Sequence, residues 1–408
     1  MAVSPSRRVA FDVLRKVARG GNASDLLRIR SEKLDSRDAA LASELVFGVL
    51  RYQAQLDFLI RHYSGRDTAG LDVEVLIALR MGIYQMRYLE RIPRHAAVTE
   101  SVDLVKRAHK RSAAGFVNAV LRKVDDVAVM WPSWEIALSC PAWLLENWKR
   151  MFGREGAERI ARAFLRKPET YVWVPESRRR ELRNYDVEAT EVPECYRVVS
   201  GSVDGLQRQD ISSQTIVPLL ELEPGQRLLD VCAAPGNKTA QAVERGAQAV
   251  AVDISFDRLA AMSVPGAERV VANGSRPLPL CTEFDRVLVD APCSGTGTLG
   301  RNPEIKWRLQ PADLERHHAR QVALLENALD RLAPGGQLVY STCSLEYEEN
   351  EQVVEEVLSR RPPEFVLAHQ VRRIPGVDPG DGFYAAVIVR LREPYPEERI
   401  RDAEEPRR

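Results

Sequence analysis

The first 125 residues place apolar side chains at helical spacing. Apolar positions recur three or four residues apart in several successive stretches, and glycine, serine or proline separates the stretches at Gly20-Gly21, Ser64-Gly65 and Pro93. The clearest groups are Ala10, Val13, Leu14 and Val17; Leu41, Leu45 and Val49; Leu76, Leu79 and Ile83; Val98, Val102 and Val105; and Phe116, Val120 and Val124. The pattern predicts an all-helical bundle over residues 1–125.

A weaker pattern follows over residues 126–205. Four tryptophans accompany a predicted helix near 142–166, and a short apolar run at Tyr171–Val174 is typical of a strand. We interpret this stretch as a small connecting domain.

Buried strand patterns alternate with helical ones over residues 206–393. The predicted strands are Arg227–Val231, Ala249–Val252, Arg269–Val271, Arg286–Val289, Gln337–Ser341 and Phe383–Arg390. Such alternation predicts a mostly parallel, doubly wound sheet of the Rossmann-like α/β class. The protein is therefore expected to be multidomain, with an all-α bundle, a connecting domain and an α/β domain. The tail 394–408 is rich in Glu and Arg and is expected to be disordered.

Composition narrows the class of protein further. Hydrophobic residues make up 45% of the 408 positions, yet no apolar run approaches the roughly 20 residues of a membrane helix, and Met1–Arg8 lacks the apolar core of a secretory signal. We therefore expect a cytoplasmic protein. Its six cysteines show neither CxxC nor Cys/His ligand spacing, so the sequence predicts neither a disulfide framework nor a metal site.

Charge is unevenly distributed although the net charge is zero. Residues 1–130 contain 22 Lys and Arg against 15 Asp and Glu, and basic side chains continue into the Arg178–Arg180 run. A local positive face can bind phosphates on a neutral molecule, although a solvated helical surface would explain these charges equally well.

Two loops of the α/β part indicate a nucleotide-like ligand. The run from Asp230 to Thr239, DVCAAPGNKT, combines small residues with the start of a helix, whose free N–H groups attract a carboxylate. Asp253 ends the second predicted strand, where a carboxylate can accept both hydroxyls of a ribose. Together the loops predict an adenosine-bearing ligand, although each alone could be an ordinary capped turn.

Two further strands end in cysteines. Cys293 lies in the loop DAPCSGTG that begins at Asp290, and Cys343 lies in STCS after the next strand. A buried cysteine is usually structural, but two thiols at the active ends of adjacent strands favour chemistry. A thiolate that adds to C6 of cytosine makes C5 electron-rich enough to accept a methyl group, and a second thiol could assist the later elimination. Asp290 could bind N3 and N4 of that base, and Lys238 could lower a thiolate pKa or bind the base.

The motifs resemble a known family. DVCAAPGNKT, DAPCSGTG followed by PEIKWR, and STCS followed by EEN resemble the RNA cytosine-5 methyltransferases of the Sun/RsmB/Nop2 family, over about residues 140–392. RRVAFDVLRKV, ELVFGVLRY and GFVNAVLRKV resemble the NusB-type RNA-binding fold. This pairing is similar to the RsmB type, which implies S-adenosylmethionine as cofactor and a cytosine of small-subunit 16S ribosomal RNA as substrate.

The resemblance also implies roles for individual residues. Cys343 would be the nucleophile and Cys293 would assist release, a ranking that the residues alone leave open. The cofactor and base site would comprise Cys232, Ala233, Ala234, Pro235, Gly236, Asn237, Lys238, Asp253, Asn273 and Asp290.

Three departures from the family pattern stand out. Asn237 replaces a glycine, which is tolerable where φ is positive. Asn273 stands where an aspartate usually contacts the adenine, and it keeps an acceptor without the charge. YVWVP at 171–175 replaces an Arg-x-Asn strand, so the resemblance does not carry RNA docking over to that strand.

Two other classes of protein fit the sequence less well. A non-catalytic RNA-binding factor would explain the basic helices but not two cysteines beside a nucleotide loop. A Rossmann-type oxidoreductase would explain Asp253 but lacks GxGxxG, and amino-methyltransferases need a polar NPPY-like loop in place of APCS. We expect RNA as the partner, no DNA or membrane, and a monomeric protein.

Overall fold

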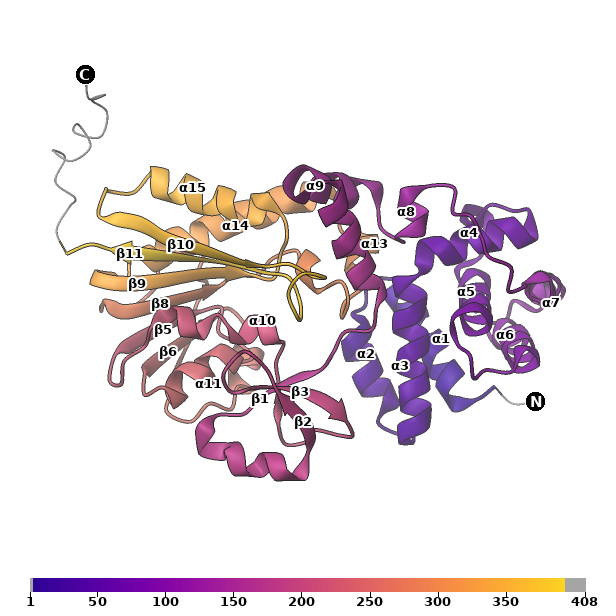
Figure 1. The fold of residues 1–408 in the computed structure, drawn as a ribbon, viewed down its shortest axis with the longest axis horizontal. Coiled ribbons are helices and arrows are strands. Elements are labelled where there is room, and N and C mark those ends of the chain that lie inside the picture. Colours follow the sequence, from indigo (N-terminus) through magenta and orange to yellow (C-terminus); the bar gives the residue numbers. More distant parts are fainter. Residues whose placement is uncertain (1–2, 393–408) are drawn as a thin grey trace, which may run out of the picture. The chain divides into compact units, whose positions relative to one another are not determined.

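The computed structural model describes residues 3–392, and the tail expected to be disordered lies outside them. The chain divides into two compact units (Figure 1). Unit 1 comprises the chain up to Lys167 together with Leu299–Leu309, and unit 2 comprises Pro168–Thr298 and the chain from Gln310 onward. The expected domain bounds at 125 and 205 do not coincide with this division, and they stay a prediction.

Unit 1 is helical. Its helices are α1 (Pro5–Val17), α2 (Ala23–Ser31), α3 (Ser36–Arg51), α4 (Gln53–Ser64), α5 (Val73–Tyr88), α6 (Arg94–Arg107), α7 (Ala114–Lys123), α8 (Trp134–Ala137), α9 (Ala142–Leu165) and α13 (Ile305–Arg308), with short 3-10 turns at Thr68–Gly70 and Arg111–Ala113. Local chemistry sets several ends: the Asn22 and Asp35 side chains cap α2 and α3, and Gly65 ends α4 in a left-handed conformation. The predicted helical bundle is confirmed.

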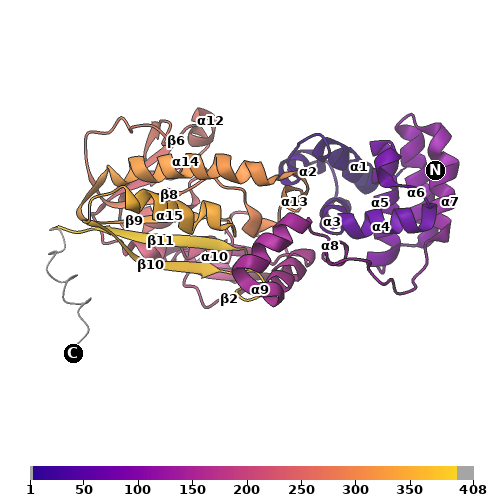
Figure 2. The ribbon, with the colours of Figure 1, turned by 90° about the horizontal axis from the view of Figure 1, so that it is seen from above.

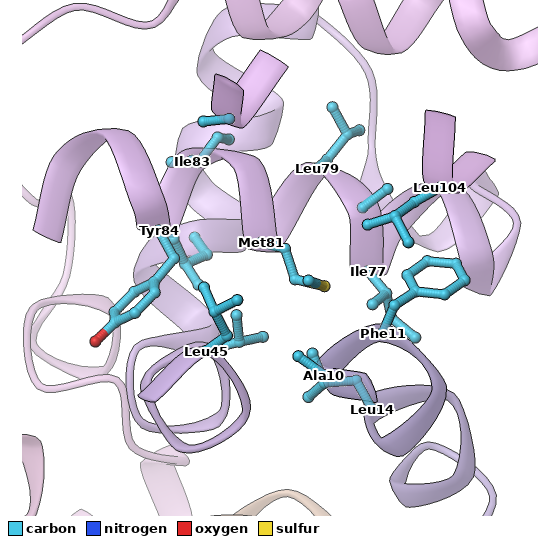
Figure 3. Close-up of a cluster of buried hydrophobic side chains, with 14 of the residues drawn as sticks. Ala10, Phe11, Leu14, Leu45, Ile77, Leu79, Met81, Ile83, Tyr84 and Leu104 are labelled. Carbon is cyan, nitrogen blue, oxygen red and sulfur yellow. The ribbon is translucent and has the colours of Figure 1, made fainter. Parts of the chain in front are cut away.

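The core of unit 1 is built from the apolar stripes of these helices. Figure 3 shows Phe11 and Leu14 of α1, Leu45 of α3 and Met81 of α5 among the buried side chains that meet at its centre. The long helix α9 contains one break, since Gly153 has φ of 71° between two helical halves. α8 is joined to α4, because Gln55 Nε2 donates to the Ala137 carbonyl at 2.7 Å.

A segment distant in sequence completes unit 1. Within Leu299–Leu309, Lys306 Nζ donates to the Arg51 carbonyl at 2.8 Å, and Trp307 Nε1 donates to the Leu50 carbonyl at 2.7 Å. In return, the Arg51 guanidinium donates to the Gly300 carbonyl at 2.9 and 3.1 Å. Burial lowers the pKa of Lys306 to about 8, so these bonds are made in a dry environment. The PEIKWR motif therefore belongs structurally to the helical unit.

Unit 2 begins with a small antiparallel sheet. Its strands are β1 (Tyr171–Trp173), β2 (Asp186–Ala189), β3 (Cys195–Ser200) and β4 (Gln207–Arg208), in the order β2-β3-β1-β4, with a 3-10 stretch at Glu176–Asn184. The strand expected at Tyr171–Val174 is confirmed as β1. The other three were not predicted, because their side chains are mostly half-buried or exposed and give no apolar run.

The large sheet of unit 2 has the order β10-β11-β9-β8-β5-β6-β7 within the described residues. Its strands are β5 (Arg227–Val231), β6 (Gln248–Asp253), β7 (Glu268–Val271), β8 (Phe284–Asp290), β9 (Leu332–Thr342), β10 (Phe365–Arg373) and β11 (Phe383–Arg390). The strands are parallel to one another from β9 through β8, β5 and β6 to β7. Beyond β9, strand β11 pairs antiparallel with β9, and β10 pairs antiparallel with β11. The Rossmann-like class and all six predicted strands are confirmed, whereas β10 was missed.

Helices cover both faces of this sheet. They are α10 (Ile211–Gln214), α11 (Asn237–Glu244), α12 (Phe256–Ala260), α14 (Pro311–Leu329) and α15 (Glu351–Ser359), with 3-10 turns at Val217–Leu220, Thr296–Thr298 and Tyr347–Glu349. α14 and α15 pack over one face, as Figure 2 shows, and α11 packs over the other. Successive strand residues such as Leu228 and Leu229 pack into the hydrophobic layers on opposite faces of the sheet. No helix in residues 3–392 is long and apolar enough to span a membrane.

Candidate active site

A cavity of about 300 Å³ opens at the carboxyl ends of the parallel strands. The loops after β5, β6, β7, β8 and β9 all contribute to it, as the topology of an open α/β sheet predicts. The predicted site residues that line it are Cys232, Ala234, Pro235, Asp253, Asn273, Asp290, Cys293 and Cys343. The four remaining ones, Ala233, Gly236, Asn237 and Lys238, belong to the same first loop but lie outside the lining.

The first loop turns sharply before α11. Cys232 and Gly236 have φ of 66° and 100°, and Ala233 N donates to the Val252 carbonyl at 3.0 Å. A Cβ atom on Gly236 would come within 2.6 Å of Met262, so glycine is required there for space as well as for backbone conformation. Asn237, which replaces a family glycine, is the first residue of α11 and is not among the residues with positive φ. An asparagine is therefore tolerated at position 237 without a left-handed backbone conformation.

Asp253 is buried and already bonded to the protein. Its Oδ2 accepts a hydrogen bond from Ala234 N at 3.2 Å, its Oδ1 accepts one from Ser255 N at 2.9 Å, and Arg258 Nη1 lies 3.6 Å from Oδ2. Each carboxylate oxygen has a second lone pair. Asp253 can thus hold the loop and still accept ligand hydroxyls.

Asn273 faces the same cavity from the loop after β7. Its Oδ1 accepts a hydrogen bond from Ser275 N at 3.0 Å, so the acceptor expected to face a ligand also holds its own loop. The neighbouring Gly274 lies close to the core, since a Cβ atom there would come within 2.8 Å of Val231 and Leu324. This part of the wall is therefore fixed by the packing of β5 and α14.

Asp290 and Lys238 form an ion pair beside the cavity. Lys238 Nζ donates to Asp290 Oδ2 at 2.6 Å and to Ser213 Oγ at 3.0 Å, and Ser341 Oγ donates to Asp290 Oδ1 at 2.9 Å. Lys238 is buried, and its ammonium lies 5.4 Å from the centre of the Phe383 ring. The lysine thus orients the carboxylate, and these contacts join it to Asp290 rather than to a thiol.

The two thiols meet across adjacent strands. Cys293 Sγ and Cys343 Sγ are 3.3 Å apart, and both side chains are half-buried. Two causes raise the pKa of Cys293 well above its ordinary range: the larger is the hydrogen bond to Cys343, and the smaller is burial. The two sulfur atoms form one hydrogen-bonded pair, in which either thiol can be the donor. By contrast, burial raises the pKa of Cys232 to about 12, which makes that thiol inert.

A buried carboxylate ties the two thiol-bearing loops together. Glu349 Oε1 accepts from Ser294 N at 2.8 Å and from Gln321 Nε2 at 3.1 Å. Its Oε2 accepts from Ser344 Oγ at 2.5 Å and from Ser294 Oγ. Since Ser294 follows Cys293 and Ser344 follows Cys343, a single side chain holds both loops from behind.

Close backbone packing reinforces this arrangement. Gly297 N donates to the Cys343 carbonyl at 2.9 Å, and Gly382 N donates to the Gly297 carbonyl at 2.8 Å. A Cβ atom on Gly297 would lie 2.3 Å from the Gly382 carbonyl oxygen, so no other residue fits there without a shift of the backbone. The glycine-rich loop after β8 thus lets two strands place their thiols side by side.

A second buried acid lies below the first loop. Asp230, at the end of β5, accepts a hydrogen bond from Thr239 Oγ1 at 2.6 Å through Oδ2, while its Oδ1 has no partner among the described residues. Burial raises the pKa of Asp230 to about 7. Its charge therefore changes near neutral pH, next to the loop that precedes α11.

Sequence reasoning missed three residues at this site. Arg258 and Arg320 line the cavity from α12 and α14, and Glu349 supports it from behind. Glu349 lies in the EEN run that follows STCS, and an acid so near a cysteine loop is the one signal that could mark it. Nothing in the sequence marked the two arginines. Within residues 3–392, no group of three or more His, Cys, Asp or Glu side chains could hold a metal ion.

Comparisons with known proteins place this architecture. Residues 217–399 match the family model "16S rRNA methyltransferase RsmB/F", and residues 4–126 match the NusB family model. The chain is 32% identical to the "Ribosomal RNA small subunit methyltransferase B" of Erwinia tasmaniensis over 94% of this chain and 98% of that protein. It is also 32% identical to the protein of the same name from Klebsiella pneumoniae, over 92% and 96%.

Solved structures agree with the fold. The crystal structure titled PH0851 superposes with a TM-score of 0.79 at 21% identity, over 95% of this chain and 99% of that chain. A methyltransferase homologue from Pyrococcus horikoshii gives a TM-score of 0.54 at 26% identity, over 64% and 100%. The protein is a methyltransferase with S-adenosylmethionine as its cofactor. With the helical unit matched by NusB and the catalytic unit matched by RsmB/F, the chain belongs to the family of the ribosomal RNA small subunit methyltransferases B.

Proposed function

We propose that this enzyme methylates C5 of a cytosine in 16S ribosomal RNA, through a transient bond between Cys343 and C6 of the base. The observation that carries the proposal is the pair of thiols 3.3 Å apart at the wall of the cofactor cavity. Methylation of a ring carbon needs a nucleophile, whereas methylation of an exocyclic amine does not. The names of the relatives supply the ribosomal RNA.

The cavity suits the cofactor. Asp253 offers acceptors for ribose hydroxyls, and the N-terminus of α11 together with Arg258 and Arg320 favours a carboxylate. When bound, S-adenosylmethionine supplies an electrophilic methyl group. We assign its site to the first loop together with Asp253, Asn273 and Asp290.

The chain's own residues would then act in turn. The Cys343 thiolate forms a bond to C6, and the displaced ring electrons make C5 nucleophilic. Asp290, held by Lys238 and Ser341, accepts a hydrogen bond from the N4 amino group and from N3 once the addition has protonated that nitrogen, which favours the addition. After C5 has gained the methyl group, its proton is lost to a base or water, the S–C6 bond breaks, and its electron pair returns to Cys343 as thiolate.

The arrangement of the two thiols suits two different roles. The Sγ atom of Cys293 lies 3.3 Å from that of Cys343, and either sulfur can donate to the other. The position of Cys293 beside Cys343 suits a group that assists departure of the product. This agrees with the roles that the family resemblance implies, with Cys343 as nucleophile and Cys293 in release.

RNA would be held in part by the helical unit. Its first 130 residues have an excess of seven positive charges, and the NusB model covers most of these residues.

An enzyme acting on ribosomal RNA is expected in the cytoplasm. The natural oligomeric form is expected to be the monomer.

Methyl transfer tests the proposal directly. Purified protein is incubated with labelled S-adenosylmethionine and 16S ribosomal RNA transcribed in vitro, with 23S RNA and DNA of matched length as controls. The RNA is then digested to nucleosides and separated by mass spectrometry. The proposal predicts label in 5-methylcytidine from 16S RNA. Label in methylated amino groups, in ribose, or in no nucleoside would reject it.

A further inference from the structure

A second cavity lies entirely within unit 1. It measures about 400 Å³ and is lined by α1 and the loop after it, α3, the start of α4, α5 and the segment Leu299–Leu309. Its apolar wall includes Leu14 and Ile77, both labelled in Figure 3. Polar or aromatic side chains line the rest: Gln53, Arg80, Glu304, Trp307 and Arg308. Cavities of this size with an apolar wall and a few polar groups are typical ligand sites.

One polar group in that wall is incompletely bonded. Glu304 is 1% exposed, its Oε1 accepts a hydrogen bond from Ala23 N at 3.0 Å, and its Oε2 has no hydrogen-bond partner among the residues that the structure describes. The nearby Arg308 guanidinium is 3.9 Å from Oε1 and donates to the Gly20 and Gly21 carbonyls. A buried carboxylate oxygen left without a donor is costly. A ligand with N–H groups would relieve this cost.

The surroundings of the cavity carry the opposite charge. Arg19 stands between Ala18 and Gly20, which both line the cavity, and Lys16 lies in the last turn of α1. Both side chains are exposed, and neither forms an ion pair with any residue in 3–392. These cations repel an ammonium ligand and attract phosphate. The cavity therefore combines an inner hydrogen-bond acceptor with outer positive charge.

We propose that this cavity binds an unstacked guanine of the RNA substrate. Guanine presents two adjacent donors, N1–H and the N2 amino group, on its Watson–Crick edge, whereas adenine and cytosine place an acceptor beside their amino group. Glu304 accepts from that edge, Trp307 offers a flat ring for stacking, and Lys16 and Arg19 hold the adjoining phosphates. The inference rests on RNA being the substrate and adds a base-specific subsite outside the catalytic unit.

Binding of short RNAs tests the preference. Fluorescein-labelled nonauridylates with G, A, C or U at the central position are titrated with the full-length protein, and fluorescence anisotropy is recorded. The central guanosine should bind at least about tenfold more tightly than the other three, since it gains hydrogen bonds to a charged acceptor. Glu304→Gln should remove this difference and leave the other three affinities unchanged. Glu32→Gln, an exposed and unpaired acid of the same unit, is the matched control.

A second measurement uses the unaltered protein, because Glu304 also supports Ala23. RNA with a central 6-thioguanosine keeps both N–H donors, and its photocross-link should map to residues 299–309 or to the end of α1. Equal affinities for the four RNAs, a preference that survives Glu304→Gln, or a cross-link confined to unit 2 would overturn the proposal. A cavity that binds a protein segment instead would give the first of these results.

The methyl-transfer assay and the RNA-binding experiments distinguish failure of the guanine subsite from failure of the proposed reaction. Methyl transfer to 16S RNA with no guanine preference rejects the subsite alone. A guanine preference mapped to unit 1 in a protein that forms no 5-methylcytidine supports the subsite and rejects the proposed reaction.

Discussion

Glu349 accepts hydrogen bonds from the residues that follow the two cavity-lining cysteines, from Ser294 N at 2.8 Å and from Ser344 Oγ at 2.5 Å. One carboxylate that is not part of the cavity lining therefore helps to set the distance between the two thiols. We regard Glu349 as a positioning residue.

Glu349→Gln should slow methyl transfer at saturating substrate by roughly 10- to 100-fold, because an amide cannot accept from every donor that the carboxylate binds. The KM for S-adenosylmethionine should change by less than about twofold, since Glu349 is outside the cofactor cavity. Steady-state kinetics measure both values. Glu348→Gln is the control, and its kcat should equal that of the wild type. A rise in KM without a fall in kcat would contradict the positioning role.

A trapping experiment should distinguish the roles of the two thiols. Cys343→Ala should be inactive and form no covalent complex with RNA, because the bond to C6 never forms. Cys293→Ala can still attack, but it lacks the group that assists elimination, so RNA should remain attached and survive denaturing electrophoresis. The double variant should trap nothing, and Cys281→Ala, which alters an exposed cysteine, should behave as wild type. Trapping by Cys343→Ala alone would reverse the two roles.

Loss of the Asp253 carboxylate should weaken cofactor binding. Asp253→Ala removes an acceptor for ribose hydroxyls and the anchor of Ala234 N and Ser255 N. Calorimetry should show an affinity for S-adenosylmethionine lower by at least about tenfold. Asp257→Ala, an exposed acid on the neighbouring α12, should bind as wild type. Unchanged affinity in Asp253→Ala would remove this residue from the site.

Asp230 should make stability depend on pH. Its folded-state pKa of about 7 exceeds the ordinary value of 3.8, so the folded protein binds this proton more tightly than the unfolded chain. The stabilising effect of that proton is complete below about pH 4 and is lost as the pH rises to 7. Asp230→Asn should abolish this component: its melting temperature relative to wild type should rise between pH 5 and pH 8. Parallel melting curves for the two proteins over that range would refute the assignment.

The sequence predicted the strands of the large sheet well, apart from the edge strand β10. β5 and β11 were predicted with the bounds observed, because strands buried on both faces are continuous apolar runs. β10 was missed because its side chains are half-buried or exposed and include His369, Gln370 and Arg372. Its place is set by pairing with β11, a contact that local pattern does not record.

Some residues of the candidate site could likewise be predicted from the sequence, and others could not. The cysteines, Asp253 and Asp290 could be predicted because each follows a recognisable strand, and the topology of the sheet brings such positions together. The partners of those residues could not. Glu349 lies 55 positions from Ser294, and the pairing of Lys238 with Asp290 depends on how α11 packs against β8. Such contacts exist only once the sheet has formed.

The order of synthesis gives the segment Leu299–Leu309 a further consequence. A ribosome releases α1 to α9 long before it reaches Gly300, so the Arg51 guanidinium must wait for its carbonyl acceptor. Until then, the nascent helical unit has to keep Arg51 hydrated, because burial of an unpartnered guanidinium is costly. The N-terminal unit is thus finished only after most of the catalytic unit has been translated, and the two folding events are coupled in time by an eleven-residue stretch.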